Sequence, residues 1–221
     1  MTNEITADIC VIGGGSGGLS VAAGASQMGA DVVLLESGKM GGDCLNYGCV
    51  PSKAMIAVAH AAHAVRSAGR FGIDSGEPTV DFEKVHDHVH GVIGAIAPHD
   101  SVERFEGMGV RVIQERGRFV GPNRVQAGDT VITAKRIVIS TGSRAGVPPI
   151  PGLEDVPFLT NETVFDKKSA PDHLIVIGGG PIGSELAQAH RRLGCKVTIL
   201  EMFSVLGKDD PELTEVVKNQ M

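Results

Sequence analysis

Short apolar runs alternate with small-residue helical stretches at the start of this chain. Ile9–Ile12 (I-C-V-I) is rich in β-branched residues, which predicts a strand buried on both faces. A glycine-rich turn follows it, then a helical stretch from Leu19 to Met28 and a second predicted strand at Val32–Leu35. The pattern therefore predicts a complete β–turn–α–β unit.

A second copy of this unit lies near the end of the chain, where His173–Glu201 aligns without a gap on Asp8–Glu36. Both copies contain G-x-G-x-x-G and end their second strand in an acid. The glycines let backbone N–H groups approach a pyrophosphate at a helix N-terminus, and the acid accepts a hydrogen bond from a ribose 2′-OH. G-x-G-x-x-G alone is weak evidence in a glycine-rich chain, but this context favours dinucleotide binding. The residues concerned are Gly13, Gly15, Gly18 and Glu36 in the first copy, and Gly178, Gly180, Gly183 and Glu201 in the second.

Two such units predict two dinucleotide sites or two halves of a doubly wound sheet. No Arg directly follows Glu201, which favours a free 2′-OH and therefore NAD(H) over NADP(H).

The region between the two units predicts helices and then strands. Ser52 is a candidate cap for a helix through Ala54–Ala68, and Phe82–Phe105 predicts a second helical region, interrupted at Pro98. Short apolar runs from Val110 to Ile139, separated by Gly, Pro and Asn turns, predict a β-meander.

The Pro-rich segment 147–152 is the best boundary candidate, so we expect one domain over 1–146 and a second over 147–221. Asp210 is a candidate N-cap for a last helix, with Pro211 at its first position. The second β–α–β unit has no third strand after it. We therefore expect this chain to be part of a longer protein, with an incomplete second domain.

Composition narrows the class of protein. The net charge of −6 and the pI of about 5.7 argue against a nucleic-acid surface. The longest apolar runs are too short to span a bilayer, and the acidic N-terminus does not resemble a signal peptide. We expect a soluble cytoplasmic protein.

Cys44 and Cys49 are two of only four cysteines and lie in one short segment, M-G-G-D-C-L-N-Y-G-C-V-P-S-K. A structural disulfide is disfavoured in a reducing compartment. A zinc site needs further close ligands, and inert core thiols do not suit a Gly-rich loop. A redox-active dithiol is the favoured interpretation, because Cys49 lies near a predicted helix N-terminus and Lys53, both of which favour a thiolate.

With its two flanking glycine units, this cysteine motif resembles the FAD-dependent pyridine nucleotide–disulfide oxidoreductases over essentially the whole chain. The resemblance implies an α/β fold: an FAD-binding Rossmann-like domain with a β-meander, then the start of a second Rossmann-like domain for NAD(H). It implies that Cys49 faces the flavin and that Cys44 exchanges with substrate. It also implies FAD contacts from Gly13, Gly15, Ser16, Gly18, Glu36, Ser37, Gly42, Asp43, Lys53, Gly117, Thr141, Gly142 and Ser143.

By the same resemblance Lys53 lies near the reactive edge of the flavin and pairs with Glu185, joining the two domains. Three residues depart from the family's usual pattern. Asp43 stands beside the expected pyrophosphate and needs a cation or water to offset its charge, Tyr47 lies between the cysteines, and Pro181 replaces an aromatic residue.

The implied activity passes electrons between NAD(P)H, FAD and a Cys44–Cys49 disulfide, with a small-molecule or dithiol/disulfide substrate. It is most like dihydrolipoamide dehydrogenase; a mercuric-reductase-like enzyme and a non-catalytic FAD-binding fragment stay open. Family members continue into a dimerisation domain that supplies an acid–base His–Glu pair. We therefore expect a homodimer for the full-length form and no turnover by this chain alone. His86, His88 and His90 are interpreted as a solvated helix face rather than a metal site.

Overall fold

The computed structural model describes residues 3–221 and divides into two compact units. The first holds the described residues up to Pro51 together with His90–Phe165. The second holds Ser52–Val89 together with Asp166–Met221. This division differs from the expected boundary at residue 146, because segment 52–89 groups with the C-terminal unit. The division by cofactor, 1–146 and 147–221, remains a prediction.

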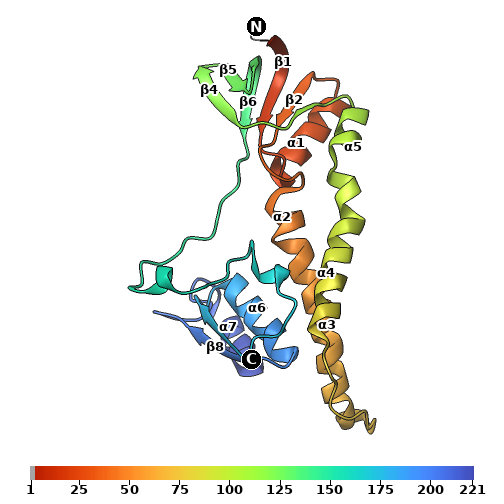
Figure 1. Cartoon of the computed structure of the whole chain (residues 1–221), viewed down its shortest axis with the longest axis vertical. Helices are drawn as coiled ribbons and strands as arrows, with labels where there is room; N and C mark the ends of the chain where they lie inside the picture. The colour runs from red at the N-terminus through yellow and green to blue at the C-terminus, as the bar shows by residue number, and fades with distance from the viewer. Residues whose placement is uncertain (1–2) are drawn as a thin grey trace. The chain divides into compact units, whose positions relative to one another are not determined.

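Figure 1 shows the fold and labels most of its helices and strands. The α-helices are α1 (Ser16–Gln27), α2 (Gly42–Asn46), α3 (Cys49–Ser67), α4 (Phe82–Ile96), α5 (Val102–Gly107), α6 (Pro181–Arg192) and α7 (Pro211–Gln220). The strands are β1 (Asn3–Ile12), β2 (Val32–Leu35), β3 (Arg111–Ile113), β4 (Gly117–Gly121), β5 (Arg124–Ala127), β6 (Thr130–Ile139), β7 (His173–Ile177) and β8 (Lys196–Leu200). Short 3-10 turns occupy Ala68–Phe71, Ala97–Asp100, Leu153–Asp155 and Val164–Asp166.

One six-stranded sheet, in the order β3-β2-β1-β6-β5-β4, forms the first unit. β3, β2, β1 and β6 pair in parallel, and β6, β5 and β4 pair antiparallel. The expected meander is present in β4–β6. β3 does not belong to it, because it pairs in parallel with β2 at the opposite edge of the sheet. The α/β fold class is confirmed.

Both faces of this sheet are covered. Side chains of α1 and α5 pack on one face, in a cluster that includes Leu19, Leu34 and Phe105. On the other face Cys10 and Leu35 pack with residues of β5 and β6, among them Ile132. Burial on both faces explains why Ile9–Ile12 at the end of β1 and all of β2 are continuous apolar runs.

The second unit contains a two-stranded parallel sheet, β7 and β8, with α6 packed against it. α7 begins as predicted, since the Asp210 side chain accepts from the Glu212 N–H and Pro211 opens the helix. Cys195 is buried in this unit, as expected for a small apolar residue.

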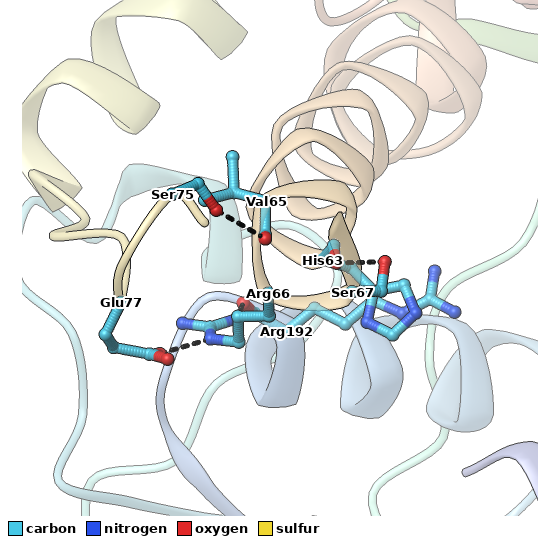
Figure 2. A network of polar contacts seen from close by, with 7 residues as sticks. All are labelled: His63, Val65, Arg66, Ser67, Ser75, Glu77 and Arg192. Carbon is cyan, nitrogen blue, oxygen red and sulfur yellow. Dashed lines mark hydrogen bonds and ion pairs between the residues drawn. The ribbon is translucent and has the colours of Figure 1, made fainter. Parts of the chain in front are cut away.

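The end of α3 is tied to the loop that follows it, as Figure 2 shows. Arg66 pairs with the Glu77 carboxylate and donates to the Arg192 carbonyl, and the Ser75 hydroxyl donates to the Val65 carbonyl at 2.9 Å. Cations at the ends of α3 and α6 also suit the negative ends of the helix dipoles. Contacts within the fold therefore account for Arg66 at the end of α3.

Across residues 3–221, no helix is long and apolar enough to cross a membrane.

Candidate functional site

The first glycine turn is shaped by close backbone contacts. Gly13 has φ +109°, which favours glycine, and a Cβ on Gly18 would lie 1.8 Å from the Gly13 carbonyl oxygen. A Cβ on Gly15, in contrast, would meet only the Gly42 Cα, at 3.6 Å. Packing within the protein therefore requires Gly13 and Gly18, and Gly15 faces open space in front of the helix N-terminus.

The second turn has the same geometry. Gly178 has φ +104°, and a Cβ on Gly183 would lie 2.0 Å from its carbonyl oxygen. A Cβ on Gly180 would meet nothing within 4 Å. The aligned sequences thus give matching turns, each with an open middle glycine at the start of a helix.

Each acid at the end of the second strand folds back onto its glycine turn. Glu36 accepts from the Gly14 N–H and the Gly38 N–H, both at 2.6 Å. Glu201 accepts from the Gly179 N–H at 2.7 Å, and its other oxygen accepts from the next loop. Hydrogen bonds from backbone N–H groups hold the pKa of Glu201 below its usual value, so its carboxylate is charged at neutral pH.

The cysteine segment is attached directly to the first glycine turn. The Gly41 N–H donates to the Gly14 carbonyl at 2.9 Å, and Gly15 and Gly41 form an isolated parallel β-bridge. Gly42 has φ +57°, and a Cβ there would lie 2.6 Å from the Gly15 Cα. Two motifs separated in the sequence thus meet in one place.

Cys44 lies in α2 and is partly buried, and Cys49 is the first residue of α3 and is exposed. The predicted cap at Ser52 is wrong, because α3 begins three residues earlier and includes Ser52 in its first turn. Both cysteines are thiols in this structure. The pKa of Cys44 is raised to about 11. The largest cause is its side-chain hydrogen bond with Cys49, followed by burial and by the negative charges of Cys49 and Asp100.

Asp43 has a partner that the sequence did not suggest. Its Oδ1 accepts from the Asn161 side-chain amide at 2.9 Å, and the same amide lies 3.5 Å from the Tyr47 carbonyl oxygen. An amide donor thus accompanies this carboxylate, and the cation or water expected to offset its charge beside a pyrophosphate stays a prediction. The Lys39 ammonium lies over the Tyr47 ring, with Nζ 5.4 Å from the ring centroid.

The predicted Lys53–Glu185 ion pair is confirmed. Lys53 Nζ lies 2.7 Å and 2.8 Å from the two carboxylate oxygens of Glu185. Both residues belong to the second compact unit, although they fall on either side of the expected boundary at residue 146. Lys53 is one helical turn after Cys49 on α3.

The remaining predicted FAD contacts of the first unit lie near the carboxyl ends of its strands. A Cβ on Gly117 would lie 2.9 Å from Leu35 Cδ1, which places Gly117 beside the end of β2. Ser16 opens α1, and Ser37 is exposed directly after Glu36.

Thr141, Gly142 and Ser143 are exposed in the segment after β6. Ser140, which sequence reasoning did not single out, anchors this segment. Its hydroxyl donates to the Ile12 carbonyl at 3.0 Å and lies 3.2 Å from the Gly13 carbonyl.

The solvated face expected for the histidines of α4 is found only at His88, which is exposed, because His86 and His90 are half-buried and have ordinary partners. His86 pairs with Asp87 at 3.0 Å, and His90 lies 3.3 Å from the Phe165 carbonyl oxygen. In the described part of the chain, no three His, Cys, Asp or Glu residues are grouped so that they could hold a metal ion.

The fold and the site together give an α/β chain in which a dinucleotide-type glycine turn lies beside a cysteine pair. The family model for pyridine nucleotide-disulphide oxidoreductases matches residues 7–221, and the chain belongs to that family.

Its similarity to known proteins extends over most of its length. It is 34% identical to a mercuric reductase of Streptomyces lividans over 96% of this chain and 46% of the relative. It is 35% identical to a dihydrolipoyl dehydrogenase of Haloferax volcanii, over 96% of this chain and 46% of that relative. The fold superposes on the Cu(II) complex of the HOCl-induced flavoprotein disulfide reductase RclA from Escherichia coli with a TM-score of 0.81, at 26% identity, over 96% of this chain and 46% of that one. The chain thus spans about half the length of these proteins.

Proposed function

We propose that this chain is the FAD-binding and dithiol-bearing part of an oxidoreductase that moves electrons between a pyridine nucleotide and a disulfide. The observation that carries this proposal is the attachment of the cysteine segment to the first glycine turn. The Gly41 N–H bond to the Gly14 carbonyl and the Gly15–Gly41 bridge bring a thiol pair to a turn suited to a pyrophosphate.

The residues present fit an FAD molecule at the first turn. The open space at Gly15 suits close approach of a phosphate to backbone N–H groups, and Glu36 lies where a ribose hydroxyl can bond to its carboxylate. Bound there, FAD supplies two-electron transfer between a nicotinamide and the dithiol. Lys53, held by Glu185, supplies a fixed positive charge one helical turn from Cys49.

The second turn supports a pyridine nucleotide site. Its open glycine, Gly180, suits a pyrophosphate, and the charged Glu201 carboxylate suits a ribose 2′-OH and repels a 2′-phosphate. We therefore propose NAD(H) rather than NADP(H).

The two cysteines have different roles in this proposal. Cys49 is the first residue of α3 and is exposed, and by the family resemblance it is the thiol that would face the flavin. Cys44 keeps its proton at neutral pH and donates it toward Cys49. When the pair reduces a disulfide substrate, two S–H bonds are lost, one S–S bond forms, and two electrons and two protons pass to the substrate, which leaves as two thiols.

The substrate we favour is a small dithiol or disulfide of the dihydrolipoamide type. Mercuric ion is the second candidate, because several similar proteins carry the name mercuric reductase. The proposal extends to a homodimer for the full-length enzyme and to a cytoplasmic location.

The colour and absorption spectrum of the purified chain test the proposal. We expect a yellow protein that develops a long-wavelength charge-transfer band on two-electron reduction, because the reduced Cys49 would face the bound flavin. Cys49→Ser should remove that band and retain the flavin. Cys44→Ser should show a band without reduction, since Cys49 then stays reduced and cannot form the disulfide. A colourless protein that binds no added FAD, with thiols that do not interconvert with a disulfide, would overturn the proposal.

A further inference from the structure

A residue far from the cysteine motif in the sequence bonds to it in the structure. Asn161 lies in the coil before β7, and its side-chain amide donates to Asp43 Oδ1 at 2.9 Å. The same nitrogen lies 3.5 Å from the Tyr47 carbonyl oxygen, a longer and weaker contact. All three residues belong to the first compact unit.

These contacts bracket one of the two redox cysteines. Asp43 directly precedes Cys44, and Tyr47 lies between Cys44 and Cys49. Asn161 therefore bonds to the segment on both sides of Cys44, with the stronger bond to the ionisable Asp43 side chain.

The cysteine segment needs such support, because α2 has only five residues and a helix of that length is not stable by itself. At its start the segment is fixed by the Gly41 N–H bond to the Gly14 carbonyl. Internally, the Asn46 amide donates to the Gly42 carbonyl at 2.8 Å. Asn161 adds a fixed point from a separate part of the chain.

We propose that Asn161 is a positioning residue for the Cys44–Cys49 pair, which rests on the redox function proposed above. By restraining the segment, Asn161 keeps the two thiols within hydrogen-bonding reach of each other, the arrangement from which a disulfide closes. A dithiol without this restraint gains chain freedom that the closed disulfide lacks. Loss of Asn161 therefore favours the dithiol.

The reaction that reports this effect is exchange with glutathione. The Cys44–Cys49 dithiol gives up two protons and two electrons and forms one S–S bond, and one glutathione disulfide takes them up and becomes two glutathione molecules. The equilibrium constant is measured by equilibrating the 221-residue chain in glutathione buffers, blocking free thiols with an alkylating agent and weighing the products by mass spectrometry.

Asn161→Ala should lower the constant for disulfide formation by about fivefold, the expected effect of one exposed, charge-assisted hydrogen bond. For a two-electron couple this raises the reduction potential by about 20 mV. Asn161→Asp should act in the same direction, because an ionised carboxylate cannot donate to Asp43. Being isosteric with Asn, it also keeps the test usable if alanine disturbs the coil.

Two further variants separate positioning from general damage. Thr163→Val removes a hydroxyl that accepts from the Thr160 N–H at 3.0 Å, so it perturbs the same coil without touching the cysteine segment. Thr163→Val should leave the equilibrium constant for disulfide formation within about twofold of the value for the unaltered chain. The exchange Asp43→Asn with Asn161→Asp restores the pair with donor and acceptor reversed, and should recover most of the lost fivefold because the Asp43 bond is the stronger one.

The inference is overturned if Asn161→Ala and Asn161→Asp keep the original constant while the chain remains folded. It is equally overturned if Thr163→Val shifts the constant as much as they do, or if the reversed pair recovers nothing. Failure of the proposed function gives a different result: the unaltered chain itself then forms no reversible Cys44–Cys49 disulfide.

Discussion

Replacing Gly18 by alanine should destabilise the first unit, since its own backbone leaves no room for a methyl group. A Cβ on Gly18 would lie 1.8 Å from the Gly13 carbonyl oxygen and 2.7 Å from Ser140 Oγ. The Ser140 hydroxyl can rotate away, but the Gly13 carbonyl belongs to a turn between β1 and α1. Relief therefore requires α1 to move away from the sheet against which it packs.

The size of the effect follows from two opposed terms. Overpacking a well-packed site costs about 1–3 kcal/mol, and occasionally more. Alanine in place of glycine in a helix returns up to about 1 kcal/mol. With the clash at the upper end of its range, we expect a net loss of about 2 kcal/mol, which for a chain of this length lowers Tm by roughly 4–8 °C.

Two neighbouring glycines provide matched controls for this measurement by thermal unfolding. A Cβ on Gly17 would come no closer than 3.9 Å to Ser140 Cβ, so Gly17→Ala should keep or slightly raise Tm. Gly15 has an extended backbone at the helix N-cap, so Gly15→Ala should also keep Tm within a few degrees.

Flavin content separates Gly15 from Gly17. Under the proposed function Gly15→Ala should lose bound FAD, because its methyl group fills the space in front of the helix N-terminus, and Gly17→Ala should retain it. The reasoning on packing is refuted if Gly18→Ala unfolds at the same temperature as Gly17→Ala. The assignment of the phosphate site is refuted if Gly15→Ala retains full flavin content.

Three further predictions concern the second unit. Burial lowers the pKa of His190, whose ring bonds to the Leu186 carbonyl at 2.8 Å. Because the folded state resists protonation of this ring, the stability is full above about pH 6.5. It is lost as the pH falls below that value, by at most about 1.4 kcal/mol per pH unit. Urea unfolding at several pH values checks this, and an unchanged slope in His190→Gln would count against it. Lys53→Met should cost less than about 1 kcal/mol in urea unfolding, because the Lys53 and Glu185 side chains are 62% and 34% exposed; a loss above about 2 kcal/mol contradicts this. Glu201→Ala should weaken NADH binding by about tenfold and NADPH binding by less, as measured by fluorescence titration; equal losses for both would remove the basis for an NAD(H) preference.

Local sequence patterns were sufficient to predict the repeated units. Gly13 and Gly18 sit at fixed spacing between an apolar strand and a small-residue helix, and the structure gives each the contact that its glycine identity suggests. The Lys53–Glu185 pair was predicted only through a family resemblance, because no local pattern connects residues 132 positions apart.

Most of the errors and omissions share one physical cause, which is that long-range pairing leaves little trace in local periodicity. β3 resembles any short strand in a meander, and its place beside β2 depends on the helices between them. Ser140 and Asn161 are ordinary polar residues in coil segments, and only the folded chain brings them to the Gly13 turn and to Asp43. The start of α3 at Cys49 was missed for a local reason, because Gly48, the residue before it, has no side chain that could cap a helix.

The position of Tyr47 also has an optical consequence. The chain contains one tyrosine and no tryptophan, so Tyr47 accounts for all of its intrinsic ultraviolet emission apart from the weak contribution of phenylalanine. Its ring lies against the Lys39 ammonium, in the short stretch between the two thiols. Thiol groups, disulfides and a nearby flavin each quench tyrosine emission to a different extent. The unlabelled protein therefore carries its own spectroscopic probe beside the cysteine pair, and changes in the tyrosine emission report the state of that pair.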